Sequence, residues 1–103
     1  MINTIKKLFG LGSKTDMAAL IASGAVIVDV RSPAEYASGH ISNSVNMPLD
    51  SLQGRLSKLK KGVPVITCCA SGMRSRVARS ILQSNGFKVY NGGSWNNLKQ
   101  YTK

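Results

Sequence analysis

Short apolar runs alternate with polar, helix-forming stretches along most of this chain. Residues 25–30 (AVIVDV) and 65–69 (VITCC) are nearly continuous apolar runs of the kind found in strands that are buried on both faces of a parallel sheet. Weaker strand patterns cover residues 44–47, which are followed by Pro48, and residues 87–90. The pattern therefore predicts a sheet of four to five short strands.

Helix signals separate these runs in the first half of the chain. Residues 16–23 form a helical stretch that Gly24 ends. The segment from Ser32 to Glu35 reads SPAE, which is a capping box with proline at the first helical position. It predicts a short helix that ends near Gly39.

Three further helices are predicted in the second half. The first carries leucines at helical spacing, at Leu49, Leu52, Leu56 and Leu59. Residues 75–83 form the next, closed by residues 85–86, and its predicted inner face holds Val77, Ala78, Ile81 and Leu82. A last short helix follows residues 92–94 and carries Trp95 and Leu98.

The alternation of strands and helices predicts a three-layer α/β fold. Such connections make right-handed crossovers and a mainly parallel sheet with helices on both faces. Ligands of parallel sheets bind beyond the carboxyl ends of the strands. Residues 29–31, 69–74 and 91–93 follow predicted strands at that edge. We therefore expect the functional groups in these three segments.

The chain of 103 residues has room for one such domain, which we place at residues 15–103. Residues 1–14 are predicted to be a tail or a short amphipathic helix. Apolar side chains near two lysines leave open a membrane contact through residues 1–9, against the alternative of a docking helix or a frayed tail. The apolar run is shorter than that of a secretory signal, so we expect a cytoplasmic protein, with the periplasm as the alternative.

The charge of the chain is strongly positive. Fourteen lysines and arginines stand against four acidic residues, for a formal net charge of +10, which attracts anions. The basic residues are scattered and the six aromatic residues are dispersed, unlike the basic stripe of a nucleic-acid binder, so no nucleic-acid partner is expected. Arg76 and Arg79 could attract a small anion or an acidic partner, although exposed arginines more often only keep a protein dissolved.

The segment CCASGMRSR, residues 68–76, contains both cysteines of the chain. Two adjacent cysteines do not form a disulfide framework, and His40 is the only histidine, so neither a metal nor another cofactor is expected. A disulfide between Cys68 and Cys69 would be strained. Cys68 points to the opposite side of the strand from Cys69, and we interpret it as an inert core residue.

Cys69 stands at the start of a tight turn into a helix that is predicted to begin near Ser75. Gly72 permits the turn, which would direct successive amides inward, and the helix adds its positive end. Together with Arg74 these groups predict an anion cradle with the sulfur at its lip. They lower the pKa of the Cys69 thiol below its usual value and make it reactive at neutral pH.

Three segments together resemble the single-domain rhodaneses, which are proteins of the thiosulfate sulfurtransferase type. They are VDVRSPAEYASGHISNSVNMPL at 28–49, VITCCASGMRSRVARSIL at 65–82 and NGGSWNNL at 91–98. The resemblance implies a rhodanese-like fold in which Cys69 carries a persulfide. It also implies a short strand before the first helix, for which residues 10–17 show little pattern.

The resemblance further assigns a sulfur donor, which is thiosulfate or another small persulfide donor, and an acceptor, which is a thiol or cyanide. The persulfide would be held by the loop residues Ala70, Ser71, Gly72, Met73, Arg74 and Ser75.

Four further residues are expected near the loop. Three of them have two possible roles, and the fourth has a structural role. Asp29 and Arg31 either brace the loop or form a plain ion pair at the end of a strand. His40 is interpreted as a packing and hydrogen-bonding residue. Trp95 either walls the pocket or fills the core.

Two other functions remain open at this point. A cysteine phosphatase or arsenate reductase of related fold also uses a cysteine, a nest of amides and an arginine, but its loop has five residues between cysteine and arginine, where this chain has four. The smaller loop suits a sulfur atom better than a phosphate. The other alternative is a non-catalytic binding or redox-sensing module. We expect a monomer.

Overall fold

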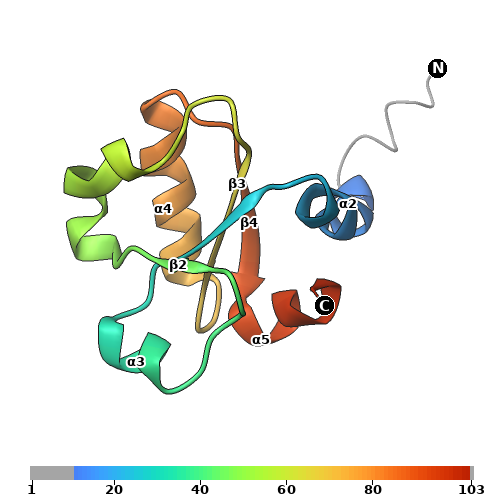
Figure 1. Cartoon of the computed structure of the whole chain (residues 1–103), viewed down its shortest axis with the longest axis horizontal. Coiled ribbons are helices and arrows are strands. Elements are labelled where there is room, and N and C mark those ends of the chain that lie inside the picture. Colours follow the sequence, from blue (N-terminus) through green and yellow to red (C-terminus); the bar gives the residue numbers. More distant parts are fainter. Residues whose placement is uncertain (1–10, 103) are drawn as a thin grey trace.

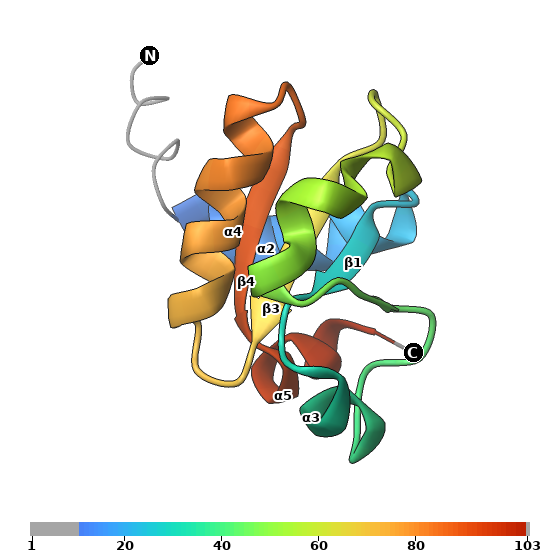
Figure 2. The ribbon, with the colours of Figure 1, turned by 90° about the vertical axis from the view of Figure 1, so that its left-hand side faces the viewer.

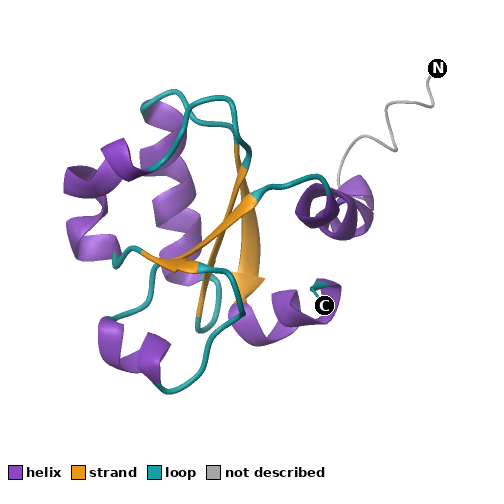
Figure 3. Cartoon of the chain, in the orientation of Figure 1, coloured by secondary structure: helices purple, strands orange, loops and turns teal. Residues whose placement is uncertain are grey.

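The computed structural model describes residues 11–102 and has three layers (Figures 1 and 3). The central sheet consists of β1 (Val26–Asp29), β2 (Val45–Asn46), β3 (Val65–Cys69) and β4 (Val89–Ser94). The strands lie in the order β2-β1-β3-β4 and every pair is parallel. The predicted α/β class and the mainly parallel sheet are confirmed. The N-terminal segment 1–9, proposed for membrane contact, lies outside the described residues.

Helices cover both faces of the sheet. The 3₁₀ helix η1 (Leu49–Lys58) and α4 (Met73–Ser84) lie on one face, and α2 (Leu11–Ala22), α5 (Trp95–Leu98) and the short 3₁₀ helix η2 (Lys99–Tyr101) lie on the other (Figure 1). The remaining helix, α3 (Pro33–Ala37), lies beyond the carboxyl ends of the strands. Among residues 11–102, none of the helices combines the length and apolar character that a membrane crossing requires.

Two separate apolar clusters fill the space between the layers. Val28, Val30, Leu52, Ala78 and Leu82 belong to the cluster under η1 and α4, and Cys69 lies in the same cluster. Ile27, Ile66, Cys68 and Leu98 belong to the cluster under α2 and α5. Because side chains alternate along a strand, the two adjacent cysteines point into different layers. The interpretation of Cys68 as a core residue is thereby confirmed, and both thiols are free.

The connection between β1 and β2 contains the capping box and the short helix that the sequence predicts. The Ser32 hydroxyl accepts a hydrogen bond from the Glu35 amide at 3.2 Å, and a Glu35 carboxylate oxygen accepts one from the Ser32 amide at 2.9 Å. This capping box begins α3 at Pro33, as predicted.

Three details of the helices differ from the prediction. The leucine-rich stretch is a 3₁₀ helix, in which side chains three residues apart, such as Leu49 and Leu52, lie above one another, and Gly54 weakens the α-helical alternative. The helix α4 begins at Met73, directly after Gly72, and not near Ser75. Val77 is 51% exposed and does not face the core.

The orientation of α4 explains the exposure of Val77. The helix presents Ser75, Ala78 and Leu82 to the sheet, and all three are buried. Val77 lies on the solvent side of the helical axis from these positions. A polar residue, Ser75, therefore takes the inward position that the hydrophobic pattern assigned to a valine.

Gly92 lies where the sheet and α5 approach most closely. A Cβ atom at this position would be 2.8 Å from Ile66 Cγ2, 2.9 Å from Leu98 Cδ2 and 2.9 Å from the Thr67 carbonyl oxygen. These distances are shorter than side-chain contacts allow. The absence of a side chain therefore lets β4 run beside β3 as far as Ser94, beyond the end predicted at residue 90.

We expect Gly92→Ala to lower the free energy of unfolding by about 1–3 kcal/mol, because the new methyl group overpacks the contact of β4 with β3 and α5. Gly54→Ala is the matched control, since a Cβ at Gly54 meets nothing within 4 Å. It should leave stability within about 1 kcal/mol of the native value. Urea unfolding measures both, and equal stabilities for the two variants would contradict this account of Gly92.

Candidate active site

The turn between β3 and α4 is only three residues long. Strand β3 ends at Cys69 and the helix begins at Met73, so residues 70–72 reverse the chain. Gly72 has φ of 106°, in the left-handed region that glycine adopts without strain. Gly72 is the N-cap of α4, and its conformation turns the first free amides of the helix back toward the end of β3.

The sulfur of Cys69 is the acceptor for these amides. Its Sγ accepts hydrogen bonds from the Gly72 amide at 2.9 Å and from the Ser75 amide at 3.3 Å. The thiol donates to Ser75 Oγ at 3.6 Å. Burial raises the pKa of Cys69, but hydrogen bonds from the Ser75 hydroxyl and amide and from the Gly72 and Ser71 amides lower that pKa more, so the net shift is downward.

Cys69 lies beneath the loop and not at its lip. Its exposed fraction is 0%, whereas Ala70 and Ser71 above it are exposed. The expectation of a sulfur at the lip of the cradle is therefore wrong. The physical reason is that Cys69 is the last residue of the strand and points into the layer under η1 and α4. A substrate can reach the sulfur only when the side chain or the loop shifts.

Ser75 connects the sulfur to the neighbouring strand β4. Its hydroxyl is 2.6 Å from Asn91 Oδ1 and 3.0 Å from the Gly72 carbonyl, and it can donate its single proton to either oxygen. Asn91 Oδ1 also accepts from the Gly93 amide at 2.9 Å. The Ser75 hydroxyl accepts a hydrogen bond from the Cys69 thiol, and it can rotate to donate its proton to the thiolate. Ser75 can therefore bind the sulfur in both protonation states.

A buried threonine holds the first turn of α4 from below. Thr67 Oγ1 donates to the Ser75 carbonyl at 3.0 Å, and Thr67 is fully buried. Sequence reasoning assigned no role to Thr67 or to the Asn91 side chain. A polar residue in the middle of an otherwise apolar strand was the only available signal for Thr67, and the position of Asn91 at the carboxyl edge was the signal for Asn91.

Arg74 does not point its guanidinium at the sulfur. Its Nη1 and Nη2 donate to the two carboxylate oxygens of Glu35 at 2.7 and 2.9 Å. Arg74 therefore acts on the Cys69 sulfur by its charge at a distance. The hydrogen bonds to Glu35 are the main cause of the raised pKa of Arg74, and the charge of Cys69 adds a smaller contribution. The pair joins the start of α4 to α3, and sequence reasoning saw only the capping role of Glu35.

Arg31 anchors α3 to the end of β1. Its Nε and Nη2 donate to the carboxylate of Asp29, with the shortest distance 2.7 Å, and both residues are buried. Nη1 and Nη2 also donate to the carbonyls of Glu35 at 3.3 Å and of Gly39 at 2.7 Å. The ion pair of the two residues is thus present, and through α3 it positions the carboxylate that binds Arg74.

Trp95 and His40 both make structural contacts. The Arg31 guanidinium lies 4.6 Å from the centre of the Trp95 ring, which also packs on the cluster under α2 and α5. His40 is exposed, stacks on Tyr36 with 3.7 Å between ring centres, and its Nδ1 is 2.7 Å from the Tyr36 carbonyl oxygen. Packing and hydrogen bonding account for His40, as predicted.

Cys68 differs chemically from its neighbour. Burial, with a smaller effect of the Asp29 charge, raises the pKa of the Cys68 thiol to about 12. The structure thus separates one thiol whose anion is stabilised from one that stays protonated.

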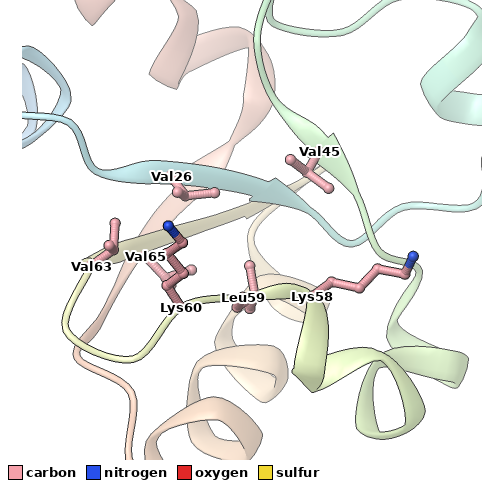
Figure 4. A pocket seen from close by; sticks show the side chains of 7 residues that line it. All are labelled: Val26, Val45, Lys58, Leu59, Lys60, Val63 and Val65. Atoms are coloured by element: carbon pink, nitrogen blue, oxygen red, sulfur yellow. The ribbon is translucent and has the colours of Figure 1, made fainter.

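An apolar cavity of about 260 Å³ lies at the opposite, amino edge of the sheet (Figure 4). Val26 and Val65, the first residues of β1 and β3, line it with Leu59, Val63 and Val45. Lys58 and Lys60 stand at its rim, and no nucleophilic or acidic side chain lines it. The cavity offers no chemistry, which supports the carboxyl edge as the candidate active site.

Comparisons with known proteins agree with this geometry. Residues 13–100 match a family model described as a rhodanese-like domain. The chain is 38% identical to the thiosulfate sulfurtransferase GlpE of Ectopseudomonas mendocina over 72 aligned residues. These residues make up 69% of this chain and 66% of that protein. It is 37% identical to the uncharacterized protein YqhL of Bacillus subtilis over 68 aligned residues. These residues make up 65% of this chain and 54% of that protein.

A solved structure with a similar fold is the human single-domain sulfurtransferase TSTD1. It has a TM-score of 0.74 and 25% identity, over 86% of this chain and 94% of that chain. The curated relatives are matched over only about half to two thirds of their own lengths.

We expect Ser75→Ala to raise the pKa of Cys69, because the thiolate loses the hydroxyl hydrogen bond while its burial is unchanged. The pH dependence of alkylation by iodoacetamide measures this pKa, and its midpoint in the native protein should lie below about 8.5, the value of a free cysteine. Ser71→Ala is the matched control, since it removes an exposed hydroxyl and keeps the Ser71 amide. Coincident midpoints for all three proteins would refute the role given to the Ser75 hydroxyl.

We expect Glu35→Gln to change how stability depends on pH. The Arg74 guanidinium and the Ser32 amide lower the pKa of Glu35 from 4.5 to about 2. The ionised carboxylate therefore stabilises the folded protein fully above pH 4.5, and this contribution is lost as the pH falls from 4.5 toward 2. Urea midpoints measured across that range should fall less steeply in Glu35→Gln than in the native protein.

Asp50→Asn is the control for this measurement. Asp50 is exposed on η1 and makes no ion pair among residues 11–102. An equal loss of pH dependence in both variants would show that Glu35 contributes nothing specific.

Proposed function

This chain belongs to the rhodanese-like domain family, and from that premise we propose that it is a sulfurtransferase. It moves sulfane sulfur from thiosulfate or a persulfide donor to a thiol or cyanide acceptor, through a persulfide on Cys69. The observation that carries the proposal is the Cys69 sulfur that accepts two amide hydrogen bonds at the start of α4. The thiosulfate sulfurtransferases among its relatives support the same reaction.

The reaction consists of two displacements at sulfur. The Cys69 thiolate attacks the sulfane sulfur of thiosulfate, the S–S bond of the donor breaks, and sulfite leaves with the electron pair. This leaves a persulfide anion on Cys69. A thiolate or cyanide then attacks the outer sulfur, and the bond between the two sulfurs breaks to return the Cys69 thiolate. Atoms and charge balance in both steps, so the reaction requires no external oxidant or reductant.

The loop supplies what these steps require. A thiolate is the reactive form of cysteine, and the hydrogen bonds to Cys69 favour it over the thiol. The persulfide is also an anion, and we propose that amides of residues 70–75 hold its outer sulfur after the loop has shifted to admit the donor. The net charge of +10 raises the local concentration of an anionic donor.

Ser75 and Arg74 have positioning roles in this proposal. Thr67 and Asn91 hold Ser75 by the hydrogen bonds described above, and Ser75 holds the sulfur. Arg74 fixes the outer side of the loop by its pair with Glu35. Asp29, Arg31 and Trp95 act one step further away, through α3. We propose that residues 15–103 work as a single domain and as a monomer, without a nucleic-acid partner.

The size of the loop argues against phosphate chemistry. Four residues separate Cys69 from Arg74, and the arginine that would bind a phosphate is paired with Glu35. A module that only binds a partner would have no need for a cysteine whose pKa is lowered. A redox sensor would share that cysteine, and only the enzyme would form thiocyanate.

We expect the native protein to form thiocyanate from thiosulfate and cyanide, and Cys69→Ser to form none, because serine is not ionised at neutral pH and carries no sulfur. Mass spectrometry after thiosulfate treatment should show a gain of about 32 Da, one sulfur atom, on the native protein only. Cys68→Ala is the matched control and should keep both the adduct and the activity.

The same preparation is also assayed for phosphatase activity with p-nitrophenyl phosphate as substrate. Phosphate release without thiocyanate would favour the phosphatase alternative. A native protein that forms neither product and no adduct would favour the binding module. Either result would overturn the proposed sulfur transfer.

A further inference from the structure

The apolar side chains most exposed in the described part of the chain lie beside the Cys69 loop. Among residues 11–102, Met73 is 63% exposed and Val77 is 51% exposed, followed by Val45 at 40% on the edge strand. Met73 and Val77 are four residues apart on α4, so they share one side of its first turns. This side faces away from the sheet, opposite the buried Ser75, Ala78 and Leu82, and α4 itself lies on the outer flank of the molecule (Figure 2).

The same side of α4 is positively charged. Arg76 is exposed and lies between Met73 and Val77 in the sequence, and α4 contains no acidic residue. Two of the acids in the described residues are already paired, Asp29 with Arg31 and Glu35 with Arg74. We name Met73, Arg76 and Val77 the α4 patch. It combines apolar surface with uncompensated positive charge.

The patch does not match the small reactants of the proposed reaction. Thiosulfate and cyanide have no apolar surface to bury, and neither is large enough to cover two side chains one helical turn apart. A protein surface with apolar side chains and carboxylates matches both properties of the patch. The α4 helix begins directly at the loop that covers Cys69, so a partner that docks on it is held within reach of that loop.

We propose that the α4 patch docks an acidic protein that presents a cysteine, and that this protein is the sulfur acceptor. The inference rests on the proposed function and names the class of its acceptor. The partner thiolate attacks the outer sulfur of the Cys69 persulfide, a new S–S bond forms on the partner, and the old S–S bond breaks to leave the Cys69 thiolate. The partner leaves as a persulfide, and no further reactant is consumed.

The experiment measures single-turnover discharge of protein that has been loaded with thiosulfate and then freed of it. The acceptors are cyanide and two synthetic cysteine peptides, one with leucine and aspartate around the cysteine and one with lysine in place of aspartate. We expect the acidic peptide to react roughly tenfold faster than the basic one with the native protein. Val77→Ser and Arg76→Glu should each slow the acidic peptide several-fold and change discharge by cyanide by less than about twofold.

Lys58→Glu is the matched control for Arg76→Glu. It makes the same change in net charge at the opposite edge of the sheet, where Lys58 lies at the rim of the cavity in Figure 4. It should leave the acidic peptide as fast as in the native protein. Equal rates for the two peptides, or equal losses in Arg76→Glu and Lys58→Glu, would overturn the docking site while leaving sulfur transfer intact. Failure of the native protein to load any sulfur would instead overturn the proposed function, and the inference with it.

Discussion

The hydrogen bonds from the Gly72 and Ser75 amides to the Cys69 sulfur are the interaction on which the active site depends. They exist because the chain reverses from β3 into α4 within three residues, through a glycine in the left-handed region. The first amides of a helix have no partner inside the helix, so they are available to an anion at this position. In this fold the acceptor at that position is the sulfur of Cys69, the last residue of the preceding strand.

Burial and reactivity oppose each other at Cys69. Enclosure of the sulfur by itself favours the neutral thiol, and the surrounding donors reverse that preference. Cys68 shows the result of enclosure without such donors, because burial, with a smaller effect of the Asp29 charge, raises its pKa to about 12. Two adjacent thiols therefore differ in chemistry according to which layer of the fold they enter.

The loop is supported from three sides by polar contacts. Thr67 holds the first turn of α4 from within β3, and Asn91 reaches Ser75 from within the neighbouring strand β4. On the third side Glu35 binds Arg74, and the buried pair of Asp29 and Arg31 holds the helix that carries Glu35. These supports come from segments far apart in the sequence. Thr67 and Asn91 are register partners inside β3 and β4, whereas Asp29 ends β1 at the carboxyl edge of the parallel sheet.

The sequence by itself determined the order of most elements and the position of the candidate reactive residue. Apolar runs located β1 and β3, the SPAE box located α3, and the turn after VITCC identified Cys69 and its amides, because all of these depend on interactions between residues close in the chain. Only the tertiary structure decided that Cys69 is covered, that Arg74 binds Glu35, and that Val77 is exposed while Ser75 is buried. Those outcomes depend on how α3 and α4 are placed against the sheet, and hydrophobic periodicity does not encode which polar group a distant segment brings into contact.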